Sequence, residues 1–235
     1  MADLYAGTSG WAYASWKPDF YPAKLPAAKF LSHYATQLNS VEVNYTFRRR
    51  VSDVSLDSWI NSTPEGFKFS AKAHQRITHI LRLKNAGESV RFFLESLEPL
   101  QQAGKLGVVL IQLPPFLKAN PALLSEFLAD VPRLHRFAFE FRHESWFTDE
   151  IYEILKGRNA ALCIAESEKL ECPDVVTADF VYYRYRMPNY SPADMKAIHT
   201  KMRAHLDANR DAFVYFKHED TPDGALNAVR LLSTI

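Results

Sequence analysis

The stretch Phe137-Ala138-Phe139-Glu140-Phe141-Arg142 is a short apolar run that closes on two charged side chains. An ionisable group at the tip of a buried strand needs a partner, because an unpaired buried charge is costly. Apolar runs with a charged or amide tip recur at four other places: Glu42-Val43-Asn44, Ala71-Lys72-Ala73-His74, Gln112 and Arg184. The carboxyl ends of all strands meet at one mouth of a closed parallel barrel, so these tips predict a polar site at that mouth.

Strand-like and helix-like stretches alternate along the whole chain. Most strand-like runs are β-branched, aromatic or continuously apolar, as strands covered on both faces should be. The predicted strands cover 3–8, 40–45, 67–73, 106–112, 137–141, 160–165, 180–184 and 212–216. One predicted helix begins near Pro26, and six more cover 53–60, 87–103, 121–128, 149–155, 192–206 and 223–232. Residues 166–179 show no clear helix. Eight strands in 235 residues predict a single (β/α)8 TIM-type barrel over 1–235. The alternative is an open doubly wound sheet with one or two extra strands.

The composition argues against a membrane protein and excludes few other classes of protein. Hydrophobic residues make up 47% of the chain, enough for a large core, and the formal net charge of +1 does not favour a nucleic acid partner. The first residues do not resemble a signal peptide, and no apolar run is long enough to span a bilayer. The two cysteines form no CxxC pair. We therefore expect a cytoplasmic protein without a membrane partner, and nothing in the sequence indicates its oligomeric state.

Three candidate catalytic residues follow from the alternation of side chains along a strand. Glu42 is expected to face the lumen as a general base, or to point outward and pair with a helix lysine. Lys72 is expected to bind an anion, to act as an amine of lowered pKa, or to form a structural ion pair with Glu42 or Glu140. Glu140 and Arg142 are two residues apart, so on a strand they would face the same side. We expect them either to form an ion pair with each other or to form half of a site.

The candidate ligand-binding residues lie on the same tips and in the loops beside them. The guanidinium of Arg142 suits a carboxylate or a phosphate. The loop that carries Trp11 lacks a phosphate-binding fingerprint, so it either places aromatic rings at the mouth or covers the barrel by its own packing. The histidines near these tips lack metal-ligand spacing such as HExxH, and no metal is predicted. The full ligand-binding set is Trp11, Asn44, His74, Gln112, Arg142, Trp146 and Arg184.

Three sequence blocks carry a resemblance to a known family. They are Asn39-Ser40-Val41-Glu42-Val43-Asn44, Gln112-Leu113-Pro114-Pro115 and Glu140-Phe141-Arg142-His143. With them, the chain resembles the YecE-like family, domain of unknown function 72. The resemblance implies a TIM-type barrel whose pocket is lined at these positions, and it brings no established reaction or cofactor. The chain departs from the family pattern at Arg186-Met187 and at Lys217-His218, which predicts a more basic pocket.

The mixture of carboxylates and cations at one mouth predicts an enzyme that acts on a small anionic metabolite, phosphorylated or sugar-like. Hydrolase, lyase and isomerase chemistry all remain open. One alternative is a metal-dependent phosphodiesterase or nuclease. The other is a non-catalytic module that binds a ligand or nucleic acid, for which Arg48-Arg49-Arg50 is the only dense basic patch.

Overall fold

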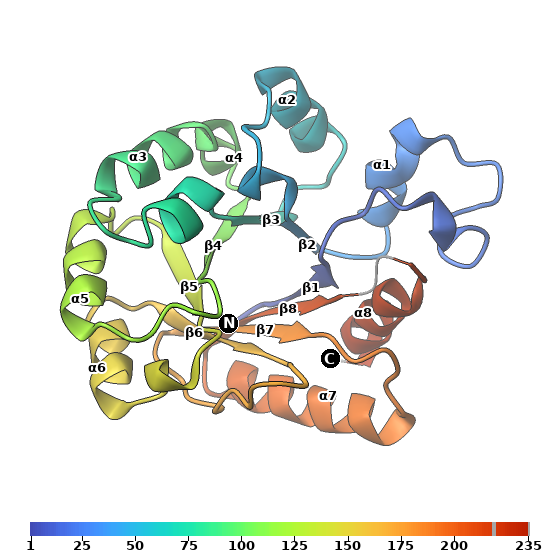
Figure 1. The fold of residues 1–235 in the computed structure, drawn as a ribbon. Coiled ribbons are helices and arrows are strands. Elements are labelled where there is room, and N and C mark those ends of the chain that lie inside the picture. Colours follow the sequence, from blue (N-terminus) through green and yellow to red (C-terminus); the bar gives the residue numbers. More distant parts are fainter. Residues whose placement is uncertain (218–219, 235) are drawn as a thin grey trace.

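Eight parallel strands curl into a barrel in the computed structural model, which describes residues 1–217 and 220–234 (Figure 1). The order within the sheet is β1-β8-β7-β6-β5-β4-β3-β2. The strands are β1 (Leu4–Thr8), β2 (Ser40–Val43), β3 (Lys68–Lys72), β4 (Leu106–Gln112), β5 (Arg136–Glu140), β6 (Ala161–Ala165), β7 (Phe180–Tyr185) and β8 (Asp211–Phe216). The predicted (β/α)8 barrel is confirmed, and each predicted strand overlaps an observed one.

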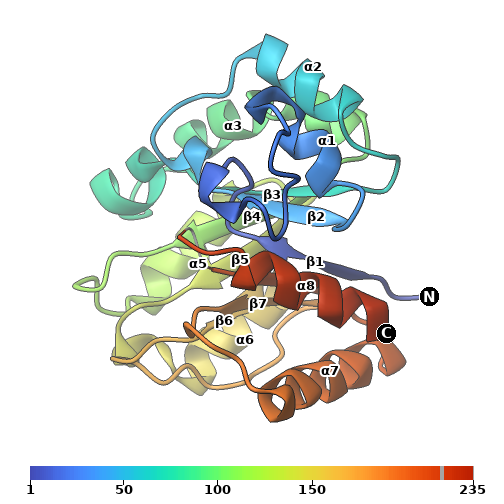
Figure 2. The same cartoon turned by 90° about the vertical axis from the view of Figure 1, so that its right-hand side faces the viewer.

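Helices alternate with the strands, except that the described residues between β6 and β7 form no helix, and they cover the outside of the barrel (Figures 1 and 2). The predicted helix over 87–103 is interrupted at Ser96 and Leu97, shortly before Pro99, which lacks a backbone donor. The predicted caps Thr148 and Ser191 both accept a hydrogen bond from the first turn of their helices. The helices are α1 (Phe30–Tyr34), α2 (Asp53–Asn61), α3 (Gly87–Glu95), α4 (Glu98–Gln102), α5 (Pro121–Asp130), α6 (Asp149–Gly157), α7 (Pro192–Asp207) and α8 (Asp223–Thr234). No described helix is long and apolar enough to cross a bilayer.

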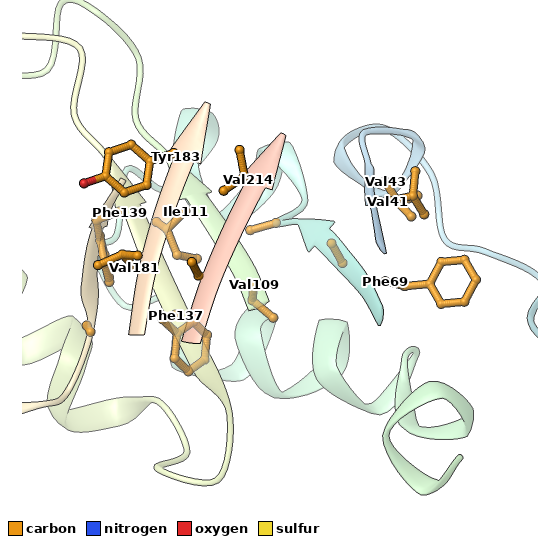
Figure 3. Packing of buried hydrophobic residues seen from close by; sticks show 14 of the residues in the cluster. Val41, Val43, Phe69, Val109, Ile111, Phe137, Phe139, Val181, Tyr183 and Val214 are labelled. Atoms are coloured by element: carbon orange, nitrogen blue, oxygen red, sulfur yellow. The ribbon is translucent and has the colours of Figure 1, made fainter. Parts of the chain in front are cut away.

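The alternation of side chains divides the core into two layers. The outward layer packs between barrel and helices, and Val41, Phe69 and Phe139 belong to it (Figure 3). A separate inner cluster that includes Leu110 and Phe213 fills the lumen. Because outward and inward positions alternate, the inward set places residues 42, 72, 112, 140 and 184 at the carboxyl ends of their strands.

The seam between β1 and β2 is closed by side chains. The hydroxyl of Tyr34 accepts from the Thr8 amide at 2.8 Å and donates to the Ser40 carbonyl at 2.9 Å. Among the described residues, no backbone ladder joins these two strands. Instead, the carboxamide of Asn39 accepts a hydrogen bond from the Ala6 amide at 2.9 Å and donates one to the Leu4 carbonyl at 2.7 Å. Gly7 permits the close approach, because a Cβ at this position would lie 1.8 Å from the Ser40 carbonyl oxygen.

The chain departs from the family pattern at Lys217-His218, and the structure describes only the first of these two residues. Lys217 is exposed and its backbone amide donates to the Tyr185 carbonyl at 2.8 Å. His218 and its neighbour Glu219 lie outside the described residues.

Candidate active site at the barrel mouth

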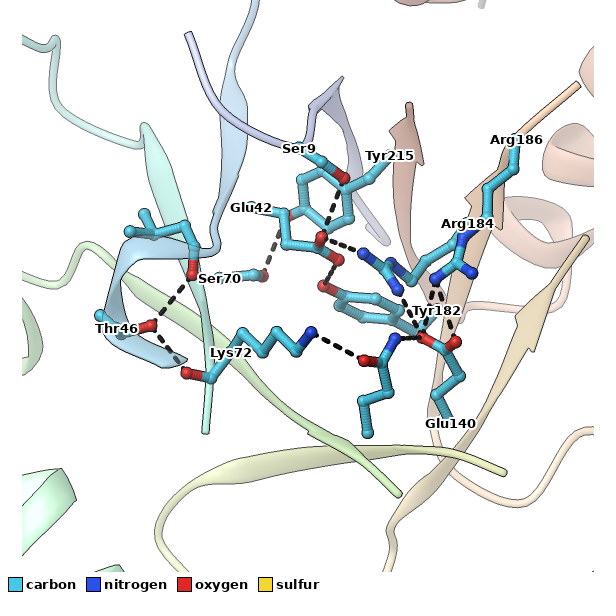
Figure 4. A network of polar contacts seen from close by, with 12 residues as sticks. Ser9, Glu42, Thr46, Ser70, Lys72, Glu140, Tyr182, Arg184, Arg186 and Tyr215 are labelled. Atoms are coloured by element: carbon cyan, nitrogen blue, oxygen red, sulfur yellow. Dashed lines mark hydrogen bonds and ion pairs between the residues drawn. The ribbon is translucent and has the colours of Figure 1, made fainter. Parts of the chain in front are cut away.

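Glu42 faces the lumen and is fully buried. Its carboxylate accepts hydrogen bonds from Ser9 Oγ at 2.9 Å, Tyr182 OH at 2.8 Å and Arg184 Nη2 at 2.7 Å (Figure 4). Burial, and after it the charge of Glu42, raise the pKa of Tyr182, so that this phenol stays a donor. The alternative of an outward glutamate paired with a helix lysine is therefore wrong.

Arg184 links two carboxylates at the centre of the mouth. Its Nη2 donates to Glu42, and its Nη1 donates to Glu140 Oε2 (Figure 4). Burial opposes its charge, but the two carboxylates outweigh burial and raise its pKa further above the ordinary arginine value. The three side chains form a buried ion network whose members stabilise one another's charge, and removal of one member would leave an uncompensated charge.

Glu140 is held as an anion. Besides Arg184, it accepts from Arg186 Nη2 at 3.0 and 3.1 Å and from Gln112 Nε2 at 2.9 Å. Burial raises the pKa of the carboxyl, but Arg184 and Arg186 together outweigh it and lower the pKa to about 2. An ion pair between Glu140 and Arg142 is not observed: Arg142 is exposed, and the partners of Glu140 come from β4, from β7 and from Arg186, which directly follows β7.

Lys72 differs from the other charged groups because no carboxylate among the described residues forms an ion pair with it. Its Nζ donates to Gln112 Oε1 at 2.7 Å and lies 4.3 Å from the centre of the Phe47 ring. Burial lowers the pKa of the amine to about 8, and the Arg184 charge acts in the same direction. The expected direct ion pair with Glu42 or Glu140 is replaced by a link through the Gln112 amide.

A pocket of about 280 Å³ opens beside this network, on the side of β5, β6 and β7. Arg142, Lys169 and Arg186 line it, together with Glu140 and Glu144. Arg186 Nε is buried and has no acceptor among the described residues. The size fits a small molecule, and the three cations favour an anion.

Two of the predicted polar residues lie at the mouth but outside the network. The Nδ1 of His74 accepts from the Arg76 amide at 3.2 Å, and its side chain lines a different cavity of about 420 Å³. Asn44 follows β2 in a 3₁₀ turn, and its Oδ1 is buried without a hydrogen-bond partner among the described residues. Neither side chain is among the hydrogen-bond partners of Glu42 and Glu140.

The two predicted aromatic residues take structural positions instead of lining the network. Trp146 is fully buried, donates its indole N–H to the Leu117 carbonyl at 2.7 Å and stacks on Phe141 at 4.5 Å, so it offers no surface to a ligand. Trp11 packs edge-on against Trp59 of α2 at 5.2 Å. Trp11 therefore packs against α2 and not against the charged network.

Ser9 and Tyr182 are functional candidates that sequence reasoning missed. Tyr182 lies two residues before Arg184 on β7, so both side chains face the lumen, and this spacing could have identified Tyr182 from the sequence. Ser9 lies in a loop, where alternation gives no direction. Within residues 1–217 and 220–234, no three His, Cys, Asp or Glu side chains come together in a group able to hold a metal ion.

Fold and site define a TIM-type barrel whose ionisable groups converge at the carboxyl ends of the strands. The chain belongs to the DUF72 family: the family model, described as a protein of unknown function, matches residues 5–235. This result confirms the resemblance to the YecE-like family seen in the sequence.

Relatives support the same assignment. The chain is 32% identical over 160 residues to UPF0759 protein YunF of Bacillus subtilis (strain 168), a match that covers 64% of this chain and 54% of YunF. The chain thus spans about half the length of that curated relative. It superposes with a TM-score of 0.86 on a DUF72 family protein from Thermotoga maritima, at 26% identity over 99% of this chain and 98% of the other. An AP endonuclease, family 2, from Brucella melitensis matches with a TM-score of 0.59 at 10% identity, over 100% of this chain and 99% of the other, and shares the fold alone.

Proposed function

We propose that this protein is an enzyme that acts on a small anionic metabolite, phosphorylated or sugar-like, at the carboxyl end of the barrel. The observation that carries the proposal is Lys72, an amine with a pKa of about 8 that is kept among buried ionic groups. An amine with this pKa is partly neutral near pH 7 and suits proton transfer or nucleophilic attack. Hydrolysis, elimination and isomerisation would all use such a group.

The other charged residues have separate roles in the proposal. Glu140, with a pKa of about 2, is a weak base near neutral pH, and we assign it to holding Arg184 and Arg186 in place. Glu42 holds Arg184 from the opposite side. Arg186 and Arg142 bind the negative group of the substrate in the pocket. Lys72 does not line this pocket, so the reacting part of the substrate extends from the pocket towards the Lys72 amine. Gln112 orients the Lys72 amine, because its oxygen accepts from Lys72 while its nitrogen donates to Glu140.

The experiment compares Lys72→Met with a control on the same strand. Lys68→Met is the control, because Lys68 lies at the opposite end of β3 and donates to the Gly104 carbonyl at 2.6 Å. Each purified protein is incubated with a panel of phosphorylated and carboxylated metabolites, and the products are followed by mass spectrometry. We expect the Lys72 variant to lose about 100-fold or more of the turnover while the control keeps it.

Binding of inorganic phosphate provides a second readout, measured by calorimetry on the parent protein and on Arg186→Gln. We expect the Arg186 variant to bind phosphate more weakly, because one of the three cations that line the pocket is lost. Unchanged turnover in Lys72→Met would refute the role of the amine, and a parent protein that neither binds phosphate nor converts any metabolite of the panel would refute the substrate class.

The two alternative functions have less support in the structure. A metal-dependent phosphodiesterase or nuclease needs a group of metal ligands, and none is formed by the described residues, although His218 and Glu219 lie outside them. The likeness to the AP endonuclease is one of fold. A purely binding role does not need the lowered pKa of Lys72, because an anion is bound best by a charged amine.

A further inference from the structure

The loops that follow β2, β3 and β4 are the most basic part of the sequence. Residues 44–52, 73–86 and 113–120 contain seven Arg and Lys and no Asp or Glu. The whole chain has 28 Lys and Arg against 27 Asp and Glu, so the remainder is acidic overall. The near-zero net charge thus hides a strong local excess of positive charge. The seven cations, which together define the basic loop surface, are Arg48, Arg49, Arg50, Arg76, Arg82, Lys84 and Lys118.

These cations are exposed and mostly not neutralised by the protein. All seven side chains are exposed to solvent. Among the described residues, the one ion pair that they form joins Arg50 to Asp53 at 3.5 Å, and both partners are more than half exposed. Glu88 is a second carboxylate nearby, since it lines the same cavity as Arg49 and Arg76. Exposed pairs of this kind contribute little, so the surface keeps most of its positive charge.

The three loops form one continuous surface. The Phe47 ring of the first loop lies 5.0 Å from the His79 ring of the second, edge to face. The Arg82 guanidinium of the second lies 5.1 Å from the Phe116 ring of the third. The strands that precede these loops are neighbours in the barrel (Figure 1). The basic loop surface therefore lies on the β2–β4 side of the mouth, while the pocket beside Glu140 lies on the β5–β7 side.

Each loop also exposes one large apolar side chain. Tyr45 is 52% exposed, Ile80 is 62% exposed and Phe116 is 62% exposed. Between the first two loops and α3 lies the cavity of about 420 Å³, with arginines on its loop side and the 61% exposed Phe92 on its helix side. Exposed rings among cations that mostly lack an ion pair with the described residues match the two needs of an unpaired nucleotide chain, which are phosphate contacts and stacking of bases.

We propose that the basic loop surface binds single-stranded nucleic acid. The arginines contact the phosphates, and unpaired bases stack on Phe116 and Tyr45. A base in a duplex is already stacked and presents no free face to these rings, so the exposed aromatic side chains favour the single strand over the double strand. This site is distinct from the proposed active site and does not depend on the proposed reaction.

The test measures fluorescence anisotropy of a labelled 20-nucleotide single strand at several salt concentrations. We expect saturable binding, and a log affinity that falls linearly with log salt concentration, by about 0.7 per phosphate contact. The variant Arg49→Gln, Arg76→Gln, Arg82→Gln should bind more weakly and reduce that slope by about 2. A control with three exposed cations changed elsewhere, Arg133→Gln, Lys156→Gln, Lys196→Gln, should keep both affinity and slope.

A single substitution separates stacking from charge. Phe116→Ala should weaken binding about tenfold and leave the salt slope unchanged, because it removes a ring and no cation. Circular dichroism checks that every variant keeps the parent fold. The proposal is overturned if no saturable binding occurs at 50 mM salt or if the two triple variants behave alike. It is also overturned if Phe116→Ala binds like the parent, or if a duplex or heparin binds as tightly as the single strand.

Discussion

Glu140→Gln tests the buried ion network most directly, because it removes one charge and keeps the shape of the side chain. In the parent protein, the Glu140 carboxylate neutralises Arg184, which is itself buried, and also pairs with Arg186. The variant leaves Arg184 with Glu42 alone. We expect a loss of stability at pH 7 that becomes smaller in acid.

The magnitude follows from the pKa of the carboxyl, which folding lowers from 4.5 to about 2. Since the folded state favours the charged form, the stabilisation is complete above pH 4.5 and is lost as the pH falls towards 2. A shift of this size corresponds to about 3 kcal/mol of unfolding free energy at pH 7 and to about half of that at pH 3. The parent and Glu140→Gln should therefore differ by about 3 kcal/mol at pH 7 and converge in acid.

The assay is urea unfolding at pH 7, 5, 4 and 3, followed by tryptophan fluorescence. Glu144→Gln is the matched control, because Glu144 is an exposed carboxylate in the loop that follows the same strand, and its loss should change stability by less than about 0.5 kcal/mol. A difference between parent and Glu140→Gln that does not depend on pH, or one below about 1 kcal/mol at pH 7, would refute the account of the network.

Three further substitutions test the seam and the lysine. Asn39→Ala should lower the unfolding free energy by about 2 kcal/mol, measured in urea, because two backbone groups of β1 lose their partner; an unchanged midpoint would contradict the side-chain closure. Gly7→Ala should prevent the soluble native fold, since its Cβ would lie 1.8 Å from the Ser40 oxygen, and expression at parental stability would argue against the close approach. Lys72→Met should raise the unfolding free energy at pH 7 by about 3 kcal/mol, because the folded state lowers the pKa of the amine from 10.5 to about 8 and so disfavours the ammonium. This gain should fade as the pH rises from 8 to 10.5, and a loss of stability at pH 7 would show that the lysine is structural.

The alternation of side chains along a strand predicted correctly which strand residues face the lumen. It gave no such guide for residues outside the strands. Glu42 and Arg184 lie within their strands, where each second side chain must face the lumen, and both were expected at the mouth. Trp11 lies in a loop and Trp146 in a short 3₁₀ turn, where the backbone sets no such period. Trp146 is fully buried, and Trp11 packs against Trp59 while it stays partly exposed. The pairing of Glu140 was also beyond the sequence, since its partner Arg186 directly follows β7, whereas Arg142, two residues further along the chain from Glu140, is exposed.

The sequence by itself determined the barrel and the polar chemistry of its mouth, because apolar runs of strand length, alternating with helices, have few ways to bury both of their faces. Only the tertiary structure decided which acid meets which base. Arg184 lies between Glu42 and Glu140, and Lys72 reaches Gln112 without an ion pair to any described carboxylate. These pairings set the low pKa of Glu140, while burial sets the lowered pKa of Lys72, and both depend on distances between strands that are far apart along the chain.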